Sequence, residues 1–129
     1  MNSLRYLRLD DTLELIRALG VGPVRDLGLL ESVLARPRSS AFGSDAYRTI
    51  DLKAAALLDS LTNNHSLVDG NKRLAWLATT VFLAINDCGS SVSDDEAFDL
   101  VVDVAAGSVE LNQIAARLRV NPLSDAGKS

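Results

Sequence analysis

The sequence predicts an all-α fold, a compact bundle of six helices that forms one domain over residues 1–120. Apolar residues recur at helical spacing along nearly the whole chain, and no two successive segments alternate as paired strands do. A chain of 129 residues with 47% hydrophobic content has the size and composition of a single domain with one core. Residues 121–129 are polar and small, so we expect a frayed C-terminal tail.

The first two helices are indicated by the residues at their ends. Asp10 or Asp11 can cap the first helix because a short carboxylate accepts hydrogen bonds from free N–H groups. Gly20 ends this helix. Asp26 can cap the second helix, and Pro37 stops it because proline cannot continue a helical hydrogen-bond ladder.

Two helices in the middle of the chain, residues 49–64 and 71–87, flank a polar segment. The later of them is apolar nearly all round, so we expect it to be the buried central helix. We assign Trp76 and Phe82 to its core contacts, in preference to stacking on a ligand.

The last two helices follow a glycine-containing turn. Ser93 and Glu96 have the spacing of a capping box, which starts a helix that runs to residue 106. Gly107 breaks it, and Ser108 begins a sixth helix that holds Leu111, Ile114 and Leu118.

The charge of the chain argues against nucleic acid as a partner. The net charge is −4, and residues 74–116 contain seven acids and no lysine or arginine, whereas nucleic-acid binders carry a basic excess. The acidic run is either a set of solvated helix faces or a docking face for a basic partner. No apolar stretch is long enough for a membrane span, and the lone Cys88 fits a reducing compartment, so we expect a cytoplasmic protein.

One segment, His65-Ser-Leu-Val-Asp-Gly-Asn-Lys-Arg73, concentrates chemically active side chains. His65 follows the end of a helix and can accept a proton near neutral pH. Asp69 is a hard carboxylate of the kind that shares Mg²⁺ with substrate phosphates. These two residues predict a base and a metal ligand in one turn.

The second half of the segment favours anion binding. The next helix begins near Asn71, and its first N–H groups and positive dipole end attract phosphate. Lys72 and Arg73 add two cations, and Gly70 allows close approach or a positive φ. The parts together indicate phosphoryl or nucleotidyl transfer.

Each of these residues alone has an ordinary structural explanation. A lone histidine can cap a helix, Asp-Gly-Asn can be a simple turn with Asn71 as N-cap, and Lys-Arg can be solvated. Their coincidence within nine residues favours a site. The chain contains neither a GxxxxGK[ST] loop nor a GxGxxG fingerprint, so other phosphate motifs do not explain it.

The segment HSLVDGNKR resembles the Fic motif, HxFx[D/E][A/G]N[G/K]R, in the variant of the death-on-curing (Doc) toxins. The segments LLESVLARPRSSAF, DLKAAALLDSLTNNH and LAWLATTVFLAINDCG are similar to helices of that family, so the resemblance covers residues 4–120. It implies a six-helix Fic/Doc-type bundle in which a buried central helix follows the motif loop.

The resemblance implies a role for each motif residue. His65 matches the catalytic base, Asp69 the acid that holds Mg²⁺, and the anion hole for ATP phosphates is matched by Gly70, Asn71, Lys72 and Arg73. Leu67 stands where the family has a phenylalanine that anchors the loop in the core, and leucine would anchor it less tightly.

Two positions favour a kinase within this family. Fic enzymes that transfer AMP read GNGRxxR, whereas this chain has Lys72 and Trp76 at the second glycine and the last arginine. Both match the Doc branch, which resembles a kinase that passes the γ-phosphate of ATP to a threonine of elongation factor Tu and arrests translation. AMP transfer by the same site is an alternative, as is a decayed Fic-fold binding module, which only Leu67 favours.

The resemblance also implies protein partners. The chain lacks the [S/T]xxxE[G/N] string of self-inhibited Fic proteins, which points to an inhibitor in trans, an antitoxin with a flexible C-terminal segment. The loop of residues 37–49 occupies the place of the family's flap, which aligns the target peptide. Phe42 and Tyr47 are candidates for that contact, or alternatively pin the loop to the core.

Overall fold

A computed structural model describes residues 3–123 of the chain, and within them it confirms the all-α class. Within this range no helix combines the length and apolar character needed to cross a bilayer. The described residues form six α-helices, which are α1 (Leu9–Leu19), α2 (Leu27–Ala35), α3 (Ile50–Asn63), α4 (Asn71–Ala84), α5 (Asp94–Ala105) and α6 (Leu111–Leu118).

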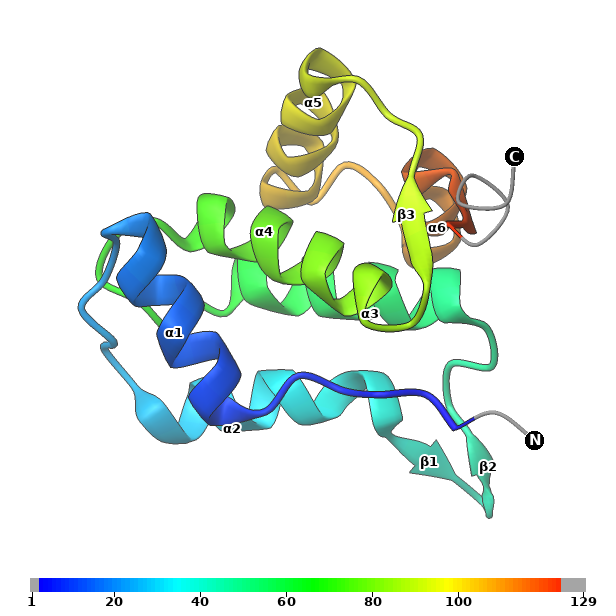
Figure 1. Cartoon of the computed structure of the whole chain (residues 1–129), viewed down its shortest axis with the longest axis horizontal. Helices are drawn as coiled ribbons and strands as arrows, with labels where there is room; N and C mark the ends of the chain where they lie inside the picture. The colour runs from blue at the N-terminus through cyan, green and yellow to red at the C-terminus, as the bar shows by residue number, and fades with distance from the viewer. Residues whose placement is uncertain (1–2, 124–129) are drawn as a thin grey trace.

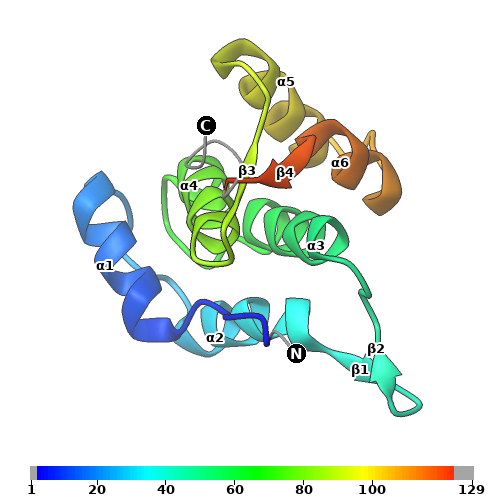
Figure 2. The same ribbon diagram turned by 45° about the vertical axis from the view of Figure 1, so that its right-hand side comes forward.

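The helices form three layers that share one core. Figures 1 and 2 show α3 and α4 side by side in the middle, with α1 and α2 on one side and α5 and α6 on the other. The expected buried helix, α4, turns Leu74, Ala78 and Phe82 into this core. Helix α3 is enclosed even more completely because it contacts α2, α4, α5 and α6.

Short irregular elements connect the helices. A 3₁₀ turn, η1 (Arg36–Arg38), follows α2 and leads into a hairpin of β1 (Ser40–Ala41) and β2 (Ser44–Asp45). A second antiparallel pair joins β3 (Cys88–Ser90) to β4 (Val120–Pro122). These strands, two or three residues long, are too short to show an alternating pattern in the sequence.

The second strand pair shortens the tail that we expected from residue 121. Asn121 and Pro122 pair with Gly89 and Cys88, and Leu123 donates its N–H to the Asp87 carbonyl at 2.8 Å. The ordered chain therefore runs beyond α6, and the rest of the expected tail, residues 124–129, lies outside the described residues.

The first helix begins earlier than we predicted. Arg8 occupies the cap position, so neither Asp10 nor Asp11 does. Asp11 lies in the first turn and accepts a hydrogen bond from the Arg8 N–H at 3.0 Å. The predicted end is confirmed, since Gly20 adopts a left-handed φ of 69° and its N–H reaches the Ile16 carbonyl.

The predicted caps of α2 and α5 are confirmed. Asp26 accepts the Leu29 N–H at 2.9 Å, and the second helix ends at Ala35, ahead of Pro37. At α5, Ser93 and Glu96 exchange backbone-to-side-chain hydrogen bonds at 2.9 and 3.2 Å.

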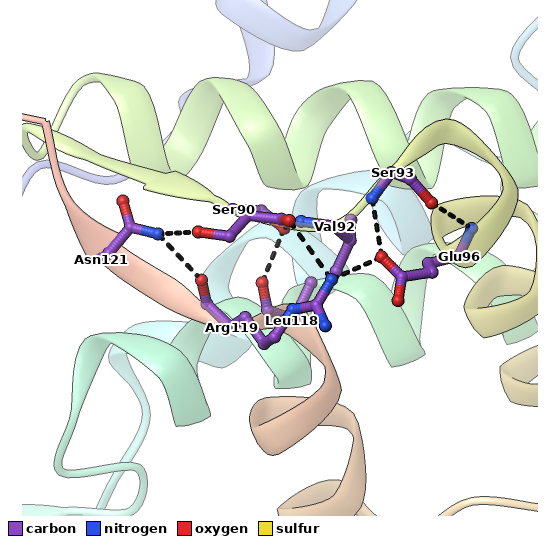
Figure 3. A network of polar contacts seen from close by, with 8 residues as sticks. Ser90, Val92, Ser93, Glu96, Leu118, Arg119 and Asn121 are labelled. Atoms are coloured by element: carbon purple, nitrogen blue, oxygen red, sulfur yellow. Dashed lines mark hydrogen bonds and ion pairs between the residues drawn. The ribbon is translucent and has the colours of Figure 1, made fainter.

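The sixth helix begins later than predicted. Glu110 occupies its cap position, whereas the Ser108 hydroxyl donates to the Asp103 carbonyl at 3.1 Å and closes the end of α5. After α6, Arg119 turns back through a left-handed φ of 47° and pairs with Glu96 (Figure 3). The Ser93 N–H first, and then Arg119, lower the pKa of Glu96 below its usual value.

Candidate active site

The site is built on the loop between α3 and α4, residues 64–70. Helix α3 ends at Asn63, and His65 then adopts a left-handed φ of 50°, a conformation that costs a side-chain-bearing residue roughly 1–2 kcal/mol. Ser66 and Leu67 turn into the protein and are buried, while Val68 and Asp69 face solvent. The loop therefore holds the imidazole outward through a strained backbone.

Leu67 anchors this loop. Its side chain is 1% exposed and belongs to the core cluster, so it fills the anchoring role of the phenylalanine that it replaces. The Asn71 carboxamide accepts the Leu67 N–H and donates to the Leu67 carbonyl, both at 3.0 Å. Gly70 holds the cap position that we also considered for Asn71, whereas the place of Asn71 in an anion hole stays a prediction.

Gly70 is fixed by two separate constraints. Its φ of 90° lies in the left-handed region, which favours glycine. A Cβ at this position would also lie 2.4 Å from Cβ of Val21, far inside contact distance. The close approach of Gly70 in this structure is therefore to Val21, two residues after the end of α1.

The structure brings all six predicted site residues to one open cavity of about 390 Å³. His65 and Asp69 come from the loop, and Lys72 and Arg73 from the exposed first turn of α4. The N–H groups of a helix's first turn have no intrahelical partner, and the helix dipole adds positive potential there. The arrangement therefore suits a polyanion placed next to an imidazole; the chemical roles of the six residues stay predictions.

The cavity offers little to a free metal ion. Asp69 is the one carboxylate among its lining residues, and within residues 3–123 no group of three or more His, Cys, Asp or Glu side chains is placed to hold a metal. Magnesium keeps several waters and commonly binds through one or two carboxylates plus substrate phosphates. The residues present therefore fit Mg²⁺ that arrives with a phosphate ligand.

The proposed flap lies away from this cavity. Figures 1 and 2 show the β1–β2 hairpin at the end of α3 opposite to the loop that leads into α4. Since α3 has 14 residues, about 20 Å of helix separates the hairpin from His65. Phe42 is fully exposed at the tip of this hairpin with a φ of 53°.

Tyr47 is held within the protein. Its hydroxyl accepts a hydrogen bond from Arg36 Nε at 2.8 Å, and the Arg36 guanidinium also lies over its ring. The same guanidinium bonds to Asp59 and Ser60 of α3 at 2.9 and 2.6 Å. These contacts agree with the alternative that Tyr47 pins the loop, and neither flap aromatic lines the cavity beside His65.

An apolar groove of about 610 Å³ adjoins the cavity and was not predicted from the sequence. It lies between α1, α4 and α5 and shares Lys72 and Arg73 with the cavity. Trp76, which we assigned to the core, is half-buried and lines this groove, whereas Phe82 is in the core as expected. On α5, Phe98 is 69% exposed and lies four residues before Val102, which is also exposed. In the sequence, the helical spacing of these two apolar residues was the signal that could have predicted an apolar surface.

Comparisons with known proteins show the family of the chain. The model of the Fic/DOC family matches residues 6–83, which span α1 to the end of α4, and the chain belongs to this family. Over 97 residues the chain is also 50% identical to a protein named Toxin Doc from Mycolicibacterium smegmatis. That similarity covers 74% of this chain and 75% of the relative.

Proposed function

We propose that this protein is the toxin of a toxin–antitoxin system and that it transfers the γ-phosphate of ATP to a threonine of elongation factor Tu. The similarity to Toxin Doc supports the toxin part. One observation carries the chemistry: His65, Asp69, Lys72 and Arg73 surround a single cavity at the N-terminus of α4. The phosphotransferase reaction, its ATP substrate and its Mg²⁺ are parts of this proposal.

The residues of the cavity divide the reaction between them. An imidazole nitrogen of His65 takes the proton from the threonine hydroxyl as its oxygen attacks the γ-phosphorus. The bond from this phosphorus to the bridging oxygen breaks, and ADP leaves. Lys72, Arg73 and the first N–H groups of α4 stabilise the charge on the phosphates. Asp69 would hold Mg²⁺, which would supply further charge neutralisation at the phosphates.

The first turns of α4 support transfer of the γ-phosphate over transfer of AMP. Lys72 adds a compact charge at the rim where AMP-transferring relatives of the motif have glycine. Trp76 has no charge to offer a phosphate, and it faces the apolar groove. The charge available to phosphates is therefore confined to the first turn, beside His65.

ATP labelled at the γ- or the α-position tests the reaction. We expect the γ-label to appear on elongation factor Tu and the α-label to stay in solution. Appearance of the α-label on the target would establish AMP transfer instead. Absence of both labels while the protein still binds its antitoxin would establish a binding module with a decayed site.

The antitoxin is the second part of this proposal, and the apolar groove is the surface that best fits its C-terminal segment. Phe98 and Val102 are exposed there at the spacing of one helical turn, which suits the apolar face of a partner helix. Because Lys72 and Arg73 belong to both hollows, a segment seated in the groove would reach the phosphate site. Docking there would therefore also inhibit the enzyme.

Replacing Phe98 with aspartate should weaken antitoxin binding by about 10²-fold or more, since it puts an unpaired charge into an apolar contact. The measurement is titration calorimetry with the antitoxin's C-terminal peptide. Phe42→Asp is the matched control because this exposed phenylalanine lies in the β1–β2 hairpin, away from the groove. Equal affinities of both variants for the peptide would remove the groove from the proposal.

A further inference from the structure

The segment that joins α1 to α2, residues 20–26, packs along the catalytic loop through its backbone. The Gly22 N–H donates to the Asp69 carbonyl at 3.0 Å, and the Val68 N–H donates to the Pro23 carbonyl at 2.9 Å. Directly after these bonds along the clamp, Val24 and Leu67 form an antiparallel bridge. We call residues 20–26 the clamp segment because it pairs with the loop from Leu67 to Asp69.

The clamp segment also fixes the start of the loop. The Ser66 carbonyl accepts the N–H groups of Arg25 and Asp26 at 2.7 and 3.2 Å. The Arg25 guanidinium reaches one residue further back, and both Nε, at 2.9 Å, and a terminal nitrogen donate to the His65 carbonyl. A charged two-nitrogen contact of this kind restrains the direction of a carbonyl more tightly than a single neutral bond does.

His65 needs such a restraint. Its φ of 50° is a conformation that residues with side chains seldom adopt, and its imidazole is exposed, with no core contact to hold it. The Leu67 anchor and the Asn71 carboxamide both act at Leu67, two residues further along. The Arg25 guanidinium is therefore the side-chain group that restrains the carbonyl of the peptide plane after His65.

We propose that Arg25 is a positioning residue for the catalytic base, which it holds through the His65 carbonyl without touching substrate. The expected effect of Arg25 on kcat rests on the proposed function, whereas its hold on the His65 carbonyl does not. Arg25 is exposed and lies 40 positions from His65, so by sequence alone it reads as an ordinary surface arginine.

The kinetic test uses Arg25→Met, Arg25→Lys and, as a matched control, Arg17→Met. Arg17 is an exposed arginine in the last turn of α1, and its ion pair with Glu14 lies on the surface. Loss of positioning should lower kcat about 10–100-fold, because misplacement of a reacting group by about 1 Å has effects of this size. KM for ATP and the melting temperature should change little, since the phosphate-binding residues are untouched.

The lysine variant should recover part of kcat because an ammonium can donate one bond to the same carbonyl. A role in folding alone would instead move the melting temperature and lower kcat equally in both variants. Arg25→Met with the kcat of the Arg17→Met control would overturn the proposal.

A second readout does not depend on activity. His65 is the only histidine, so its imidazole proton resonances in the full-length protein can be assigned without further labelling. We expect one sharp set in the wild type and in Arg17→Met, and broadened or doubled resonances in Arg25→Met that narrow again in Arg25→Lys. If the wild type transfers no phosphate, the proposed function fails and this spectrum alone decides the role of Arg25; an unchanged spectrum in Arg25→Met would contradict it.

Discussion

Replacing His65 with alanine should abolish toxicity and lower γ-phosphate transfer to elongation factor Tu by about 10²–10⁴-fold, the usual contribution of a general base. The imidazole is exposed at the rim of the cavity and has no packing role, so the variant should keep the melting temperature of the wild type within a few degrees, as for surface substitutions generally. The measurements are growth after induction, initial rates with γ-labelled ATP, and thermal unfolding.

The position of His65 allows its chemical and backbone roles to be separated. Asparagine tolerates a φ near 50° better than alanine does, but it cannot take a proton at neutral pH. His65→Asn should therefore fold as well as His65→Ala or better and be equally inactive. Transfer by His65→Asn at the wild-type rate would mean that position 65 serves the loop's shape and that another group acts as the base.

Much of the fold follows from local sequence signals. The spacing of apolar residues predicted all six helices, and the caps at Asp26 and Ser93 were found because each depends on residues within one helical turn. The starts of α1 and α6 were misplaced because several polar residues there offer competing caps, and packing decides between them. The two strand pairs join segments of two or three residues, which leave no periodic trace.

The candidate site, like the fold, was predictable only where the signal is local in sequence. The nine-residue segment located the cavity because its residues are contiguous in sequence and turn around one helix start. The supporting contacts come from distant residues. Val21 lies against Gly70, and Arg25 bonds to His65 across 40 positions. Nothing in a single sequence marks such pairs, so the residues that shape the loop became visible only in the structure.

The expected flap and the apolar groove show that residue type alone does not predict where an aromatic side chain lies. Exposed aromatics were expected near the target site, yet Phe42 lies at the far end of α3 and Tyr47 is bonded to Arg36. Trp76 and Phe98, which the sequence assigned to the core or left unassigned, line the groove beside the cavity. Phe42 stays a candidate for contact with a protein target large enough to span the molecule.

Gly70→Ala should be the most damaging single-methyl change in the site. The added Cβ would lie 2.4 Å from Cβ of Val21, and the backbone would keep a φ of 90° that alanine disfavours. Overpacking of about 1–3 kcal/mol and a left-handed penalty of about 1–2 kcal/mol together predict a loss of about 2–5 kcal/mol in the free energy of unfolding. Relief of the clash would shift the first turn of α4, so transfer should also fall about 10²-fold.

Two variants resolve this loss into its causes. Gly20→Ala has a similar φ of 69° and nothing within 4 Å of its added Cβ, so it should show the conformational penalty alone, about 1–2 kcal/mol.

Val21→Ala cannot remove the clashing Cβ but removes the methyls at 2.5 and 3.2 Å, which lets the clamp segment yield. The double variant with Gly70→Ala should therefore lose less stability than the two single changes added together. Urea unfolding of the four variants measures this coupling. Strict additivity would show that Val21 does not enforce glycine at position 70, and that the positive φ alone does.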